Sequence, residues 1–225
     1  MRRFKIAVGP ILTIGCSDVA LAGCADRPEP GVDWQRCNMQ MTILQGVDLS
    51  GANLSGAFLS GATFRGSNLV GANLQLTELV RTSFENTDLS QANFEKSLSA
   101  RSLFSSAVLR NARLSKAEFH RVNFAGADLS GADMSEGDFI RADFTDARLD
   151  GANLRGATLP RAILQGASLK DATFQNAYLY RLRVEGTDLS QVRDLAQDQL
   201  DITCGDDKTK LPPGLIKPTR WPCEY

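Results

Sequence analysis

Few side chains in this sequence could take part in catalysis. His120 is the only histidine among the 225 residues, so no histidine metal cluster can form, and a histidine-based triad would depend on this one residue. No nucleophile or pair of carboxylates is placed beside His120 by a regular spacing, and we expect it to be a surface residue. The sequence therefore predicts no catalytic residue, no cofactor and no enzyme activity.

Acidic and amide side chains recur in the sequence and could be mistaken for calcium ligands. They stand one position before an apolar residue, as in Asp48, Asn53, Asp128, Asp133, Asp138 and Asp143. No Gly-Gly-x-Gly-x-Asp repeat accompanies them, and such side chains commonly accept hydrogen bonds from the backbone at turns. We expect that structural role and no metal site.

A row of arginines is the most regular feature of the charged residues. Arginine recurs every twenty residues, at Arg81, Arg101, Arg121, Arg141, Arg161 and Arg181. If residues twenty apart stack, these side chains lie about 4.8 Å apart, and unpaired neighbours repel by about 1 kcal/mol per pair even in water. We expect nearby acids to offset this repulsion: Glu78, Glu118 and Asp138 three residues before an arginine, and Glu85 and Glu185 four residues after one.

The face that precedes these arginines is unusually apolar for a protein exterior. It carries Phe58, Val80, Leu98, Ile140, Pro160, Tyr178 and Tyr180, with His120 among them. An apolar patch bordered by arginines is a common interface composition. We therefore define a candidate partner-binding strip, which consists of the six arginines with Phe58, Ile140, Tyr178 and Tyr180. Alternatively, the arginine stems only cover apolar corners and pair with local acids.

An apolar ladder with a period of five specifies the elements that position these residues. Every fifth residue from Leu44 to Leu189 is Leu, Phe, Met or Val, except Ser99, and a small residue, most often Ala, usually stands two positions earlier. This period fits neither a helix, at about 3.6 residues, nor a strand, at about 2. It indicates a solenoid whose backbone turns every five residues.

The ladder also divides by fours. Positions twenty apart from Leu44 to Val184 are mostly Phe, and the next such column is Leu at every place from Leu49 to Leu189. This segregation predicts four five-residue units per coil, with aromatic rings stacked on one face and leucines on the next. The inward alanines keep the core narrow, which leaves no room inside for a cofactor or substrate.

This pattern resembles the pentapeptide repeat family, whose consensus is A(D/N)LXX. It stands here as Ala52-Asn53-Leu54-Ser55-Gly56 and as Ala127-Asp128-Leu129-Ser130-Gly131. The resemblance implies an all-β fold, a right-handed quadrilateral parallel β-helix of about 7.5 coils. The segment from Cys204 to Leu215 looks like the C-terminus of proteobacterial members, which suggests an exported proteobacterial type.

The expected domains are a signal peptide at 1–22, an N-terminal cap segment at 23–41, the β-helix at 42–191, and a capping helix with a disulfide-tied tail at 192–225. The signal peptide is predicted from the basic start of the chain, the apolar stretch Ile6 to Ile14 and the Ala20-Leu21-Ala22 cleavage pattern. Trp34 is expected to plug the first coil. Asp194 is expected to cap a short helix, with Gln197 three residues on.

The cysteines bear on localisation. Cleavage after Ala22 leaves an even set, grouped as Cys24 with Cys37 and Cys204 with Cys223, and we expect these two disulfides in a periplasmic or secreted bacterial protein. Alternatively, Leu21-Ala22-Gly23-Cys24 resembles a bacterial lipobox, which would make the protein a lipoprotein anchored through Cys24. We expect membrane attachment only in that second case.

The balance of charges limits the possible functions. The chain has 26 acids and 25 bases, so we expect no nucleic-acid partner. We predict a non-enzymatic, exported structural or protein-interaction scaffold, which binds an unknown protein or an anionic envelope partner and could form a homodimer. The alternative comes from the family, because some pentapeptide repeat proteins mimic DNA and protect gyrase. The neutral charge and the export signal disfavour it.

Overall fold

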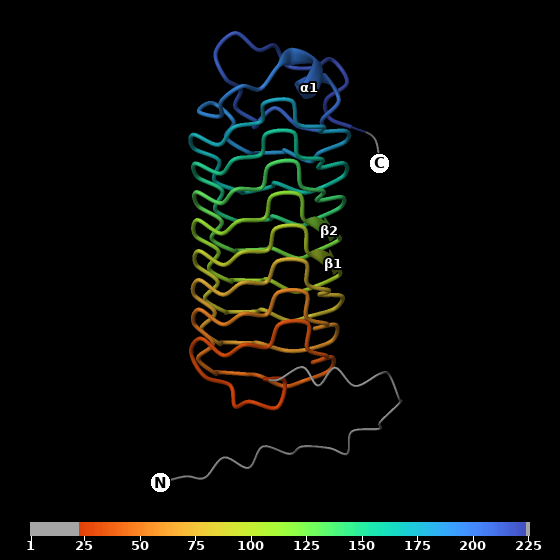
Figure 1. Ribbon diagram of the computed structural model, residues 1–225. Coiled ribbons are helices and arrows are strands. Elements are labelled where there is room, and N and C mark those ends of the chain that lie inside the picture. The colour runs from red at the N-terminus through yellow and green to blue at the C-terminus, as the bar shows by residue number, and fades with distance from the viewer. Residues whose placement is uncertain (1–22, 224–225) are drawn as a thin grey trace.

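The computed structural model describes residues 23–223, so the predicted signal peptide lies outside the described residues. The chain winds into a single stack of coils that runs from one end of the molecule to the other (Figure 1). Parallel backbone bridges join residues twenty apart, from Asp33 with Asn53 to Thr173 with Arg193. Two segments are long enough to form strands, β1 (Leu98–Ala100) and β2 (Glu118–His120), and they pair in parallel. The fold is therefore a parallel β-helix with twenty residues per coil.

The stacked phenylalanines measure the distance between coils. Successive ring centroids of the column Phe64, Phe84, Phe104, Phe124 and Phe144 lie 5.0, 4.8, 5.0 and 5.0 Å apart. These values match the spacing of hydrogen-bonded strands, about 4.8 Å. The column of rings predicted from the sequence is thus formed.

Each corner of a coil is a tight turn with one residue in the left-handed region. At one such corner the Ala52 N–H donates to the Leu49 carbonyl at 3.0 Å, and Gly51 has φ 66°. The residue before the ladder position supports the turn, because Asp48 Oδ1 accepts from the Ser50 N–H at 3.0 Å. The same bond recurs at many corners, as predicted for these Asp and Asn side chains.

Ser99 interrupts the ladder where neighbouring rings already fill the core. Phe94 lies across the interior, with its ring centroid 5.8 Å from that of Phe104 and 5.9 Å from that of Phe119. Protein interiors are close-packed, so a coil with an extra ring has less volume for its fourth ladder residue. The Ser99 side chain is buried, and its hydroxyl has no hydrogen-bond partner among the residues that the structure describes.

The β-helix begins earlier than residue 42, which corrects the predicted boundary of the N-terminal cap. Asp33 and Asn38 already pair with the next coil. Trp34 and Met39 occupy ladder places and are buried. Trp34 is therefore a core residue of the first coil and not a plug over it. The five-residue spacing continues here, with a tryptophan and a methionine at the ladder places.

A short helix, α1 (Gln197–Asp201), lies at the C-terminal end of the stack (Figure 1). The predicted cap at Asp194 is wrong, because the N-cap is Ala196, whose N–H donates to Gln199 Oε1 at 2.9 Å. Asp194 accepts a hydrogen bond from Thr173 Oγ1 at 2.9 Å instead. The last coil still turns at Asp194, and the helix begins only after it.

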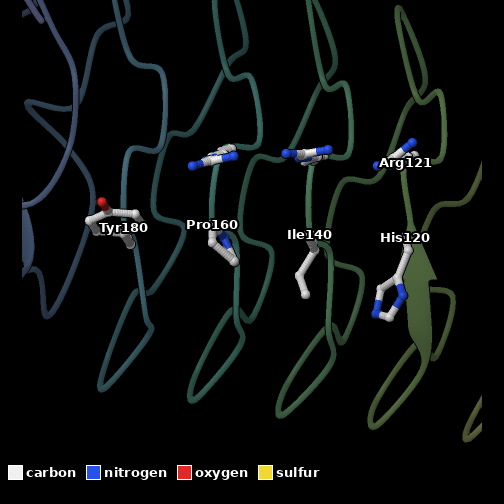
Figure 2. A pocket seen from close by; sticks show the side chains of 7 residues that line it. His120, Arg121, Ile140, Pro160 and Tyr180 are labelled. Atoms are coloured by element: carbon white, nitrogen blue, oxygen red, sulfur yellow. The ribbon is translucent and has the colours of Figure 1, made fainter. Parts of the chain in front are cut away.

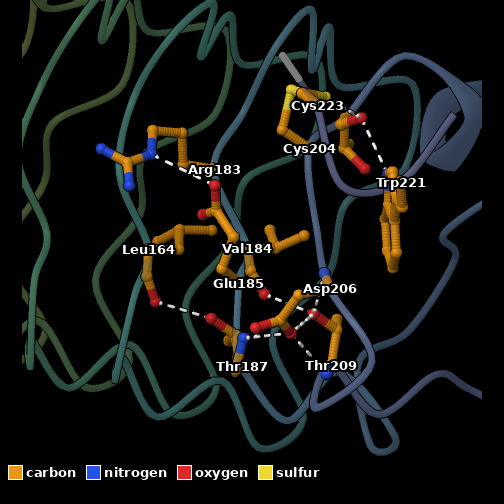
Figure 3. Close-up of polar contacts among 12 residues, drawn as sticks. Leu164, Arg183, Val184, Glu185, Thr187, Cys204, Asp206, Thr209, Trp221 and Cys223 are labelled. Carbon is orange, nitrogen blue, oxygen red and sulfur yellow. Dashed lines mark hydrogen bonds and ion pairs between the residues drawn. A yellow bond between two sulfur atoms is a disulfide. The ribbon is translucent and has the colours of Figure 1, made fainter. Parts of the chain in front are cut away.

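The tail beyond α1 adds further pairing to the last coil. Arg183 bridges to Cys204, and Asp188 bridges to Lys210. Figure 3 shows Asp206 beside Thr209, and the Asp206 Oδ1 accepts from the Gly186 N–H at 2.9 Å. The indole N–H of buried Trp221 donates to the Thr203 carbonyl at 2.9 Å. These bonds hold the tail against the end of the β-helix.

Both predicted disulfides are present. Cys24 is bonded to Cys37 at the start of the β-helix, and Cys204 is bonded to Cys223 at its end (Figure 3). Each bridge joins a terminal segment to one end of the β-helix. Cys37 is buried in the first coil, and Cys204 pairs with Arg183 of the last coil. The cysteine grouping in the sequence was therefore sufficient to predict the pairing.

Candidate partner-binding surface

The six arginines twenty residues apart form one column, which we call the arginine column. Each is the left-handed residue of its turn, with φ between 54° and 58°. Each is exposed, and its backbone N–H donates to a carbonyl of the following coil or segment; for Arg121 the acceptor is Ile140, at 2.8 Å. The backbone thus places one guanidinium-bearing side chain per coil along a single corner.

Arginine is an unfavourable choice for this backbone conformation. A left-handed residue with a Cβ atom costs about 1 kcal/mol or more, whereas glycine adopts the conformation readily. At the other three corners glycine fills five of the fifteen equivalent places between residues 86 and 176, as at Gly126, Gly131 and Gly156. The arginine column contains no glycine from Arg81 to Arg181. Six side chains are therefore retained where glycine would be less strained.

The expected acidic partners do not pair with the arginine column. Within residues 23–223, no ion pair or side-chain hydrogen bond joins any of the six arginines to the rest of the chain. The acids contact other groups: Glu78 accepts from Ser60 at 2.9 Å, Glu85 pairs with Arg65 at 3.1 Å and Glu185 pairs with Arg183 at 3.4 Å. Asp138 lies 3.1 Å from His120, and Glu118 has no ion pair within residues 23–223.

The prediction of offsetting acids was wrong because it used distance along the chain. Stacked side chains lie about 4.8 Å apart, and so a residue in the adjoining coil is closer than one three or four positions away around a corner. Glu85 pairs with Arg65, exactly one coil earlier, and Asp138 faces His120 from the next coil. The arginine column is thus left without intramolecular counter-charge in the described part of the chain.

An open, shallow depression of about 480 Å³ lies beside the middle of the column (Figure 2). Three successive arginines line it, namely Arg121, Arg141 and Arg161. Its remaining lining is a row with one residue from each of four successive coils: His120, Ile140, Pro160 and Tyr180. We call this row the adjacent column. The depression therefore combines three cations with a mostly apolar floor.

His120 occupies one end of the adjacent column. Its Nε2 lies 3.1 Å from Asp138 Oδ2, and the other oxygen of Asp138 accepts from the Ile140 N–H at 3.1 Å. Its ring is directed away from Arg121 (Figure 2). Among residues 23–223, no group of three or more His, Cys, Asp or Glu side chains could hold a metal ion.

The structure brings only part of the predicted strip into the depression. Ile140 and Tyr180 line it, and Tyr178 lies against Tyr180 with the rings 8° from parallel and their centroids 6.3 Å apart. Phe58 is exposed but does not line the depression. Pro160 belongs to the floor, although the strip omitted it. The twenty-residue spacing from Ile140 was the signal that could have included it.

The shifted pKa values of the described residues lie away from this surface. The strongest is that of Asp188, whose pKa is lowered to about 2, first by the hydrogen bond from Lys210 and then by those from Ser190. These groups hold the C-terminal tail in place. The depression itself presents guanidiniums beside mostly apolar side chains.

Comparisons with known proteins agree on the architecture. The family model described as pentapeptide repeats matches in eight copies, within residues 31–95 and 102–191. The structure of HetL, a pentapeptide repeat protein involved in heterocyst differentiation regulation from the cyanobacterium Nostoc sp. strain PCC 7120, is similar at a TM-score of 0.54. It is 24% identical, over 82% of this chain and 92% of HetL.

A second similar structure is full-length QnrB1, a plasmid-mediated fluoroquinolone resistance protein. Its TM-score is 0.58 at 19% identity, over 78% of this chain and 94% of QnrB1. At these identities the likeness concerns the fold alone. No curated protein sequence matches the chain. Within residues 23–223, no helix has the length and apolar composition needed to cross a membrane.

Proposed function

Because this chain belongs to the pentapeptide repeat family, we propose that it is a non-enzymatic scaffold that binds an anionic partner along the candidate partner-binding strip. The observation that carries the proposal is the arginine column, which exposes six guanidiniums without an acidic partner in the described chain. Guanidinium groups recognise carboxylates and phosphates through paired hydrogen bonds. The apolar floor beside them would supply the desolvated part of an interface.

The absence of a catalytic role is part of this proposal. The core of the stack is filled by ladder residues and alanines, and the candidate surface is a shallow exterior depression. His120 faces a carboxylate, but the lining contains no nucleophile for it to activate. The strip is thus suited to binding and not to covalent chemistry.

We propose an exported location, in the periplasm or outside a bacterial cell. The signal-like start of the sequence supports this location, as do two disulfides, which persist in oxidising compartments. Anchoring by lipidation would require the Cys24 sulfur, which is bonded to Cys37 in the structure. The non-lipidated form is therefore the one we favour, and the proteobacterial type belongs to the same proposal.

The finer architecture is also proposed: a right-handed quadrilateral helix with about 7.5 coils between residues 42 and 191, preceded by the earlier pairing from Asp33 and closed at its C-terminal end by α1. The cap role of α1 is supported by two contacts. Leu200 is buried, and Gln199 Nε2 donates to the carbonyls of Phe174 and Ala177. Such contacts cover the apolar end of a solenoid, which would otherwise be exposed.

The alternative function, gyrase protection by DNA mimicry, is favoured only by the likeness to QnrB1, a fluoroquinolone resistance protein. A DNA mimic must present strong negative charge, whereas this chain has 26 acids against 25 bases. A gyrase supercoiling assay with a quinolone tests it. We expect no protection, and relief of quinolone inhibition by the purified protein would establish the alternative.

The scaffold proposal is tested by removing charge from the strip. A photo-crosslinking residue at Tyr178 is combined with a variant in which Arg101, Arg121, Arg141 and Arg161 are all alanine. We expect the wild-type strip to crosslink a partner in the bacterial envelope fraction and the quadruple variant to lose it, because the guanidiniums supply the charge-assisted contacts.

The chain offers a matched control for that variant. Lys96 and Lys116 are exposed cations in the same left-handed turn position at a different corner. A Lys96→Ala/Lys116→Ala variant should keep the crosslinked partner. If the quadruple arginine variant folds, as judged by circular dichroism, and still captures every wild-type partner, the strip is only structural and the proposal fails.

A further inference from the structure

We infer that the partner of the arginine column is a second copy of this chain, which lies beside the first and points the same way, so that a twofold axis runs parallel to the stack of coils. This inference rests on the proposed function, because it names the partner of the same strip: carboxylates of the second copy supply the anionic groups. It is carried by the residues that stand level with each arginine on the same outer face.

A third column of side chains lies on the far side of the adjacent column from the arginines. In β2 the Phe119 side chain is buried, so the side chains of Glu118 and His120 point outward together, and Arg121 follows at the corner. Parallel bridges connect the residue equivalent to Glu118 from coil to coil. The third column therefore consists of Phe58, Glu78, Leu98, Glu118, Asp138, Thr158 and Tyr178.

The third column and the corner residues three positions later have complementary chemistry, coil by coil. The level pairs are Phe58 with Gly61, Glu78 with Arg81, Leu98 with Arg101, Glu118 with Arg121, Asp138 with Arg141, Thr158 with Arg161 and Tyr178 with Arg181. Three arginines are thus level with an acid and none with another cation. Within residues 23–223 no ion pair joins the two columns, because the adjacent column separates them.

A twofold axis along the adjacent column brings these level residues together between two copies. Such an axis exchanges the two sides of the face and leaves the height unchanged, so each acid of one copy faces the arginine of the equivalent coil in the other. An antiparallel copy, related by an axis across the coils, would place arginines opposite arginines, which repel one another. The charges therefore favour the parallel arrangement.

A second copy also stays in register with the arginine column along its whole length. Successive coils are 4.8 to 5.0 Å apart, and the stack is straight (Figure 1). A partner with a different repeat loses register over the six arginines, whereas two copies of one chain have the same repeat. The twofold axis itself fixes their relative height, since it allows no shift along the stack.

Each acid has capacity for the added contact. Glu118 is exposed and makes no side-chain hydrogen bond within the described chain, and Glu78 accepts one there, from Ser60. Asp138 lies 3.1 Å from His120, but a carboxylate offers about four acceptor sites. All three can therefore accept charge-assisted hydrogen bonds from guanidiniums of a second copy.

The adjacent column supplies the apolar centre of this interface. In the dimer it lies on the twofold axis, so Ile140, Pro160 and Tyr180 each meet their own counterparts. The exposed ring of Tyr178 faces Arg181 of the second copy, as in a cation–π pair. Apolar side chains bordered by charged ones are typical of interfaces.

The size of the strip determines how strong the dimer should be. Six coil intervals make it about 30 Å long, and three residues make it about 10 Å wide. This is less than the about 800 Å² per partner of a standard interface. We therefore expect a weak dimer that depends on its ion pairs.

Sedimentation equilibrium of the disulfide-intact protein tests the association. At low ionic strength we expect a monomer–dimer equilibrium, which added salt should shift to monomer because it screens exposed charges. Arg121→Gly should weaken dimerisation at least about tenfold, since the symmetry makes one substitution remove two contacts. Glycine relieves the left-handed strain, so the variant should remain folded. Arg101→Gly is the matched control, because Arg101 faces Leu98 of the second copy, and it should not weaken dimerisation.

Exchanging charges between two variants tests the pairing itself. Arg81→Glu/Arg121→Glu places acids in both columns, and Glu78→Arg/Glu118→Arg places arginines in both. Each variant alone should be monomeric, since like charges then face each other. Mixed, they should form a heterodimer about as strong as the wild-type dimer, because every altered residue again faces its opposite. Glu136 already occupies a left-handed corner, with φ 54°, so glutamate is compatible with that backbone.

A photo-crosslinking residue at Tyr178 reports the direction of the second copy. In the parallel dimer it should attach to the last coil of that copy, near Arg181. An antiparallel pair would instead place it near Phe58, at the other end of the third column. Mass spectrometry of the crosslinked peptides distinguishes the two arrangements.

Four results would overturn the inference: a monomer even at about 1 mM, equal weakening by Arg101→Gly and Arg121→Gly, no heterodimer from the exchanged variants, or a crosslink near Phe58. If the chain is monomeric but the probe at Tyr178 captures another protein through the arginines, the second copy is wrong and the anionic-partner scaffold stands. If the chain is monomeric and no capture depends on the arginines, the proposed function fails as well.

Discussion

Ser99 illustrates how single residues adapt to the space left by their neighbours. Phe94 lies nearly perpendicular to Phe84, with ring centroids 6.0 Å apart, and it also contacts Phe104 and Phe119. The serine makes room for this group of rings. Its hydroxyl is buried and has no hydrogen-bond partner within residues 23–223, which costs free energy that a methyl group would not.

Two substitutions at Ser99 should therefore act in opposite directions. Ser99→Ala should raise the free energy of unfolding by about 1 kcal/mol, since it removes an unsatisfied hydroxyl and leaves the packing intact. Ser99→Leu should lower it by about 1 to 3 kcal/mol through overpacking, although leucine is the usual ladder residue. Chemical denaturation of both variants measures this. A more stable Ser99→Leu would mean that the rings do not fill this coil.

For single residues, the sequence predicted which residue types stack in each column better than it predicted which side chains contact one another. It identified the arginine column and the Phe and Leu columns, because these depend only on spacing. It assigned the wrong partners to Glu78, Glu85 and Asp138, because their nearest neighbours come from adjoining coils. The side-chain directions at a corner, and hence those contacts, are not contained in the spacing.

Among the elements, α1 depends on tertiary contacts more than on its own sequence. It has five residues, which is too short for independent stability. Gln199 accepts from the Ala196 N–H at the start of α1, and it connects α1 to the β-helix by donating to the Phe174 and Ala177 carbonyls. The sequence predicted a helix here but placed its start too early, because it could not reveal that Asp194 completes a coil.

Gln199→Ala should consequently destabilise the C-terminal end. Loss of its three hydrogen bonds should lower the free energy of unfolding by about 2 kcal/mol, since two carbonyls of the last coil lose a donor. Gln175→Ala is the matched control, because Gln175 is exposed and makes no side-chain hydrogen bond among the described residues. Thermal denaturation compares the two. Equal melting temperatures would show that α1 contributes nothing through Gln199.

The whole molecule is stabilised by contacts between neighbouring coils. Its backbone bridges join residues about one coil apart, so each coil depends on the two beside it and the end coils have one neighbour fewer. Both disulfides lie at these ends. The sequence predicted this arrangement from the cysteine grouping, but the inclusion of Trp34 in the first coil required the structure.

Removing the C-terminal bridge should loosen that end first. The Cys204–Cys223 bond closes a span of 19 residues, and a loop of this size contributes about 3 kcal/mol in the chain-entropy account. A Cys204→Ser/Cys223→Ser variant should lose that much stability. Its amide exchange should increase in the tail and α1, while the middle coils stay protected. Uniformly faster exchange along the whole chain would contradict coil-by-coil stability.

Successive coils repeat the same backbone path, so the number of coils sets the length of the molecule. Inserting one more twenty-residue unit between two coils would lengthen the rod by about 4.8 Å without changing the path of the chain. If the unit carried arginine at its left-handed corner, the arginine column would gain one guanidinium. The length of the arginine column would thus change through duplication of a coil, while the existing corners keep their conformation.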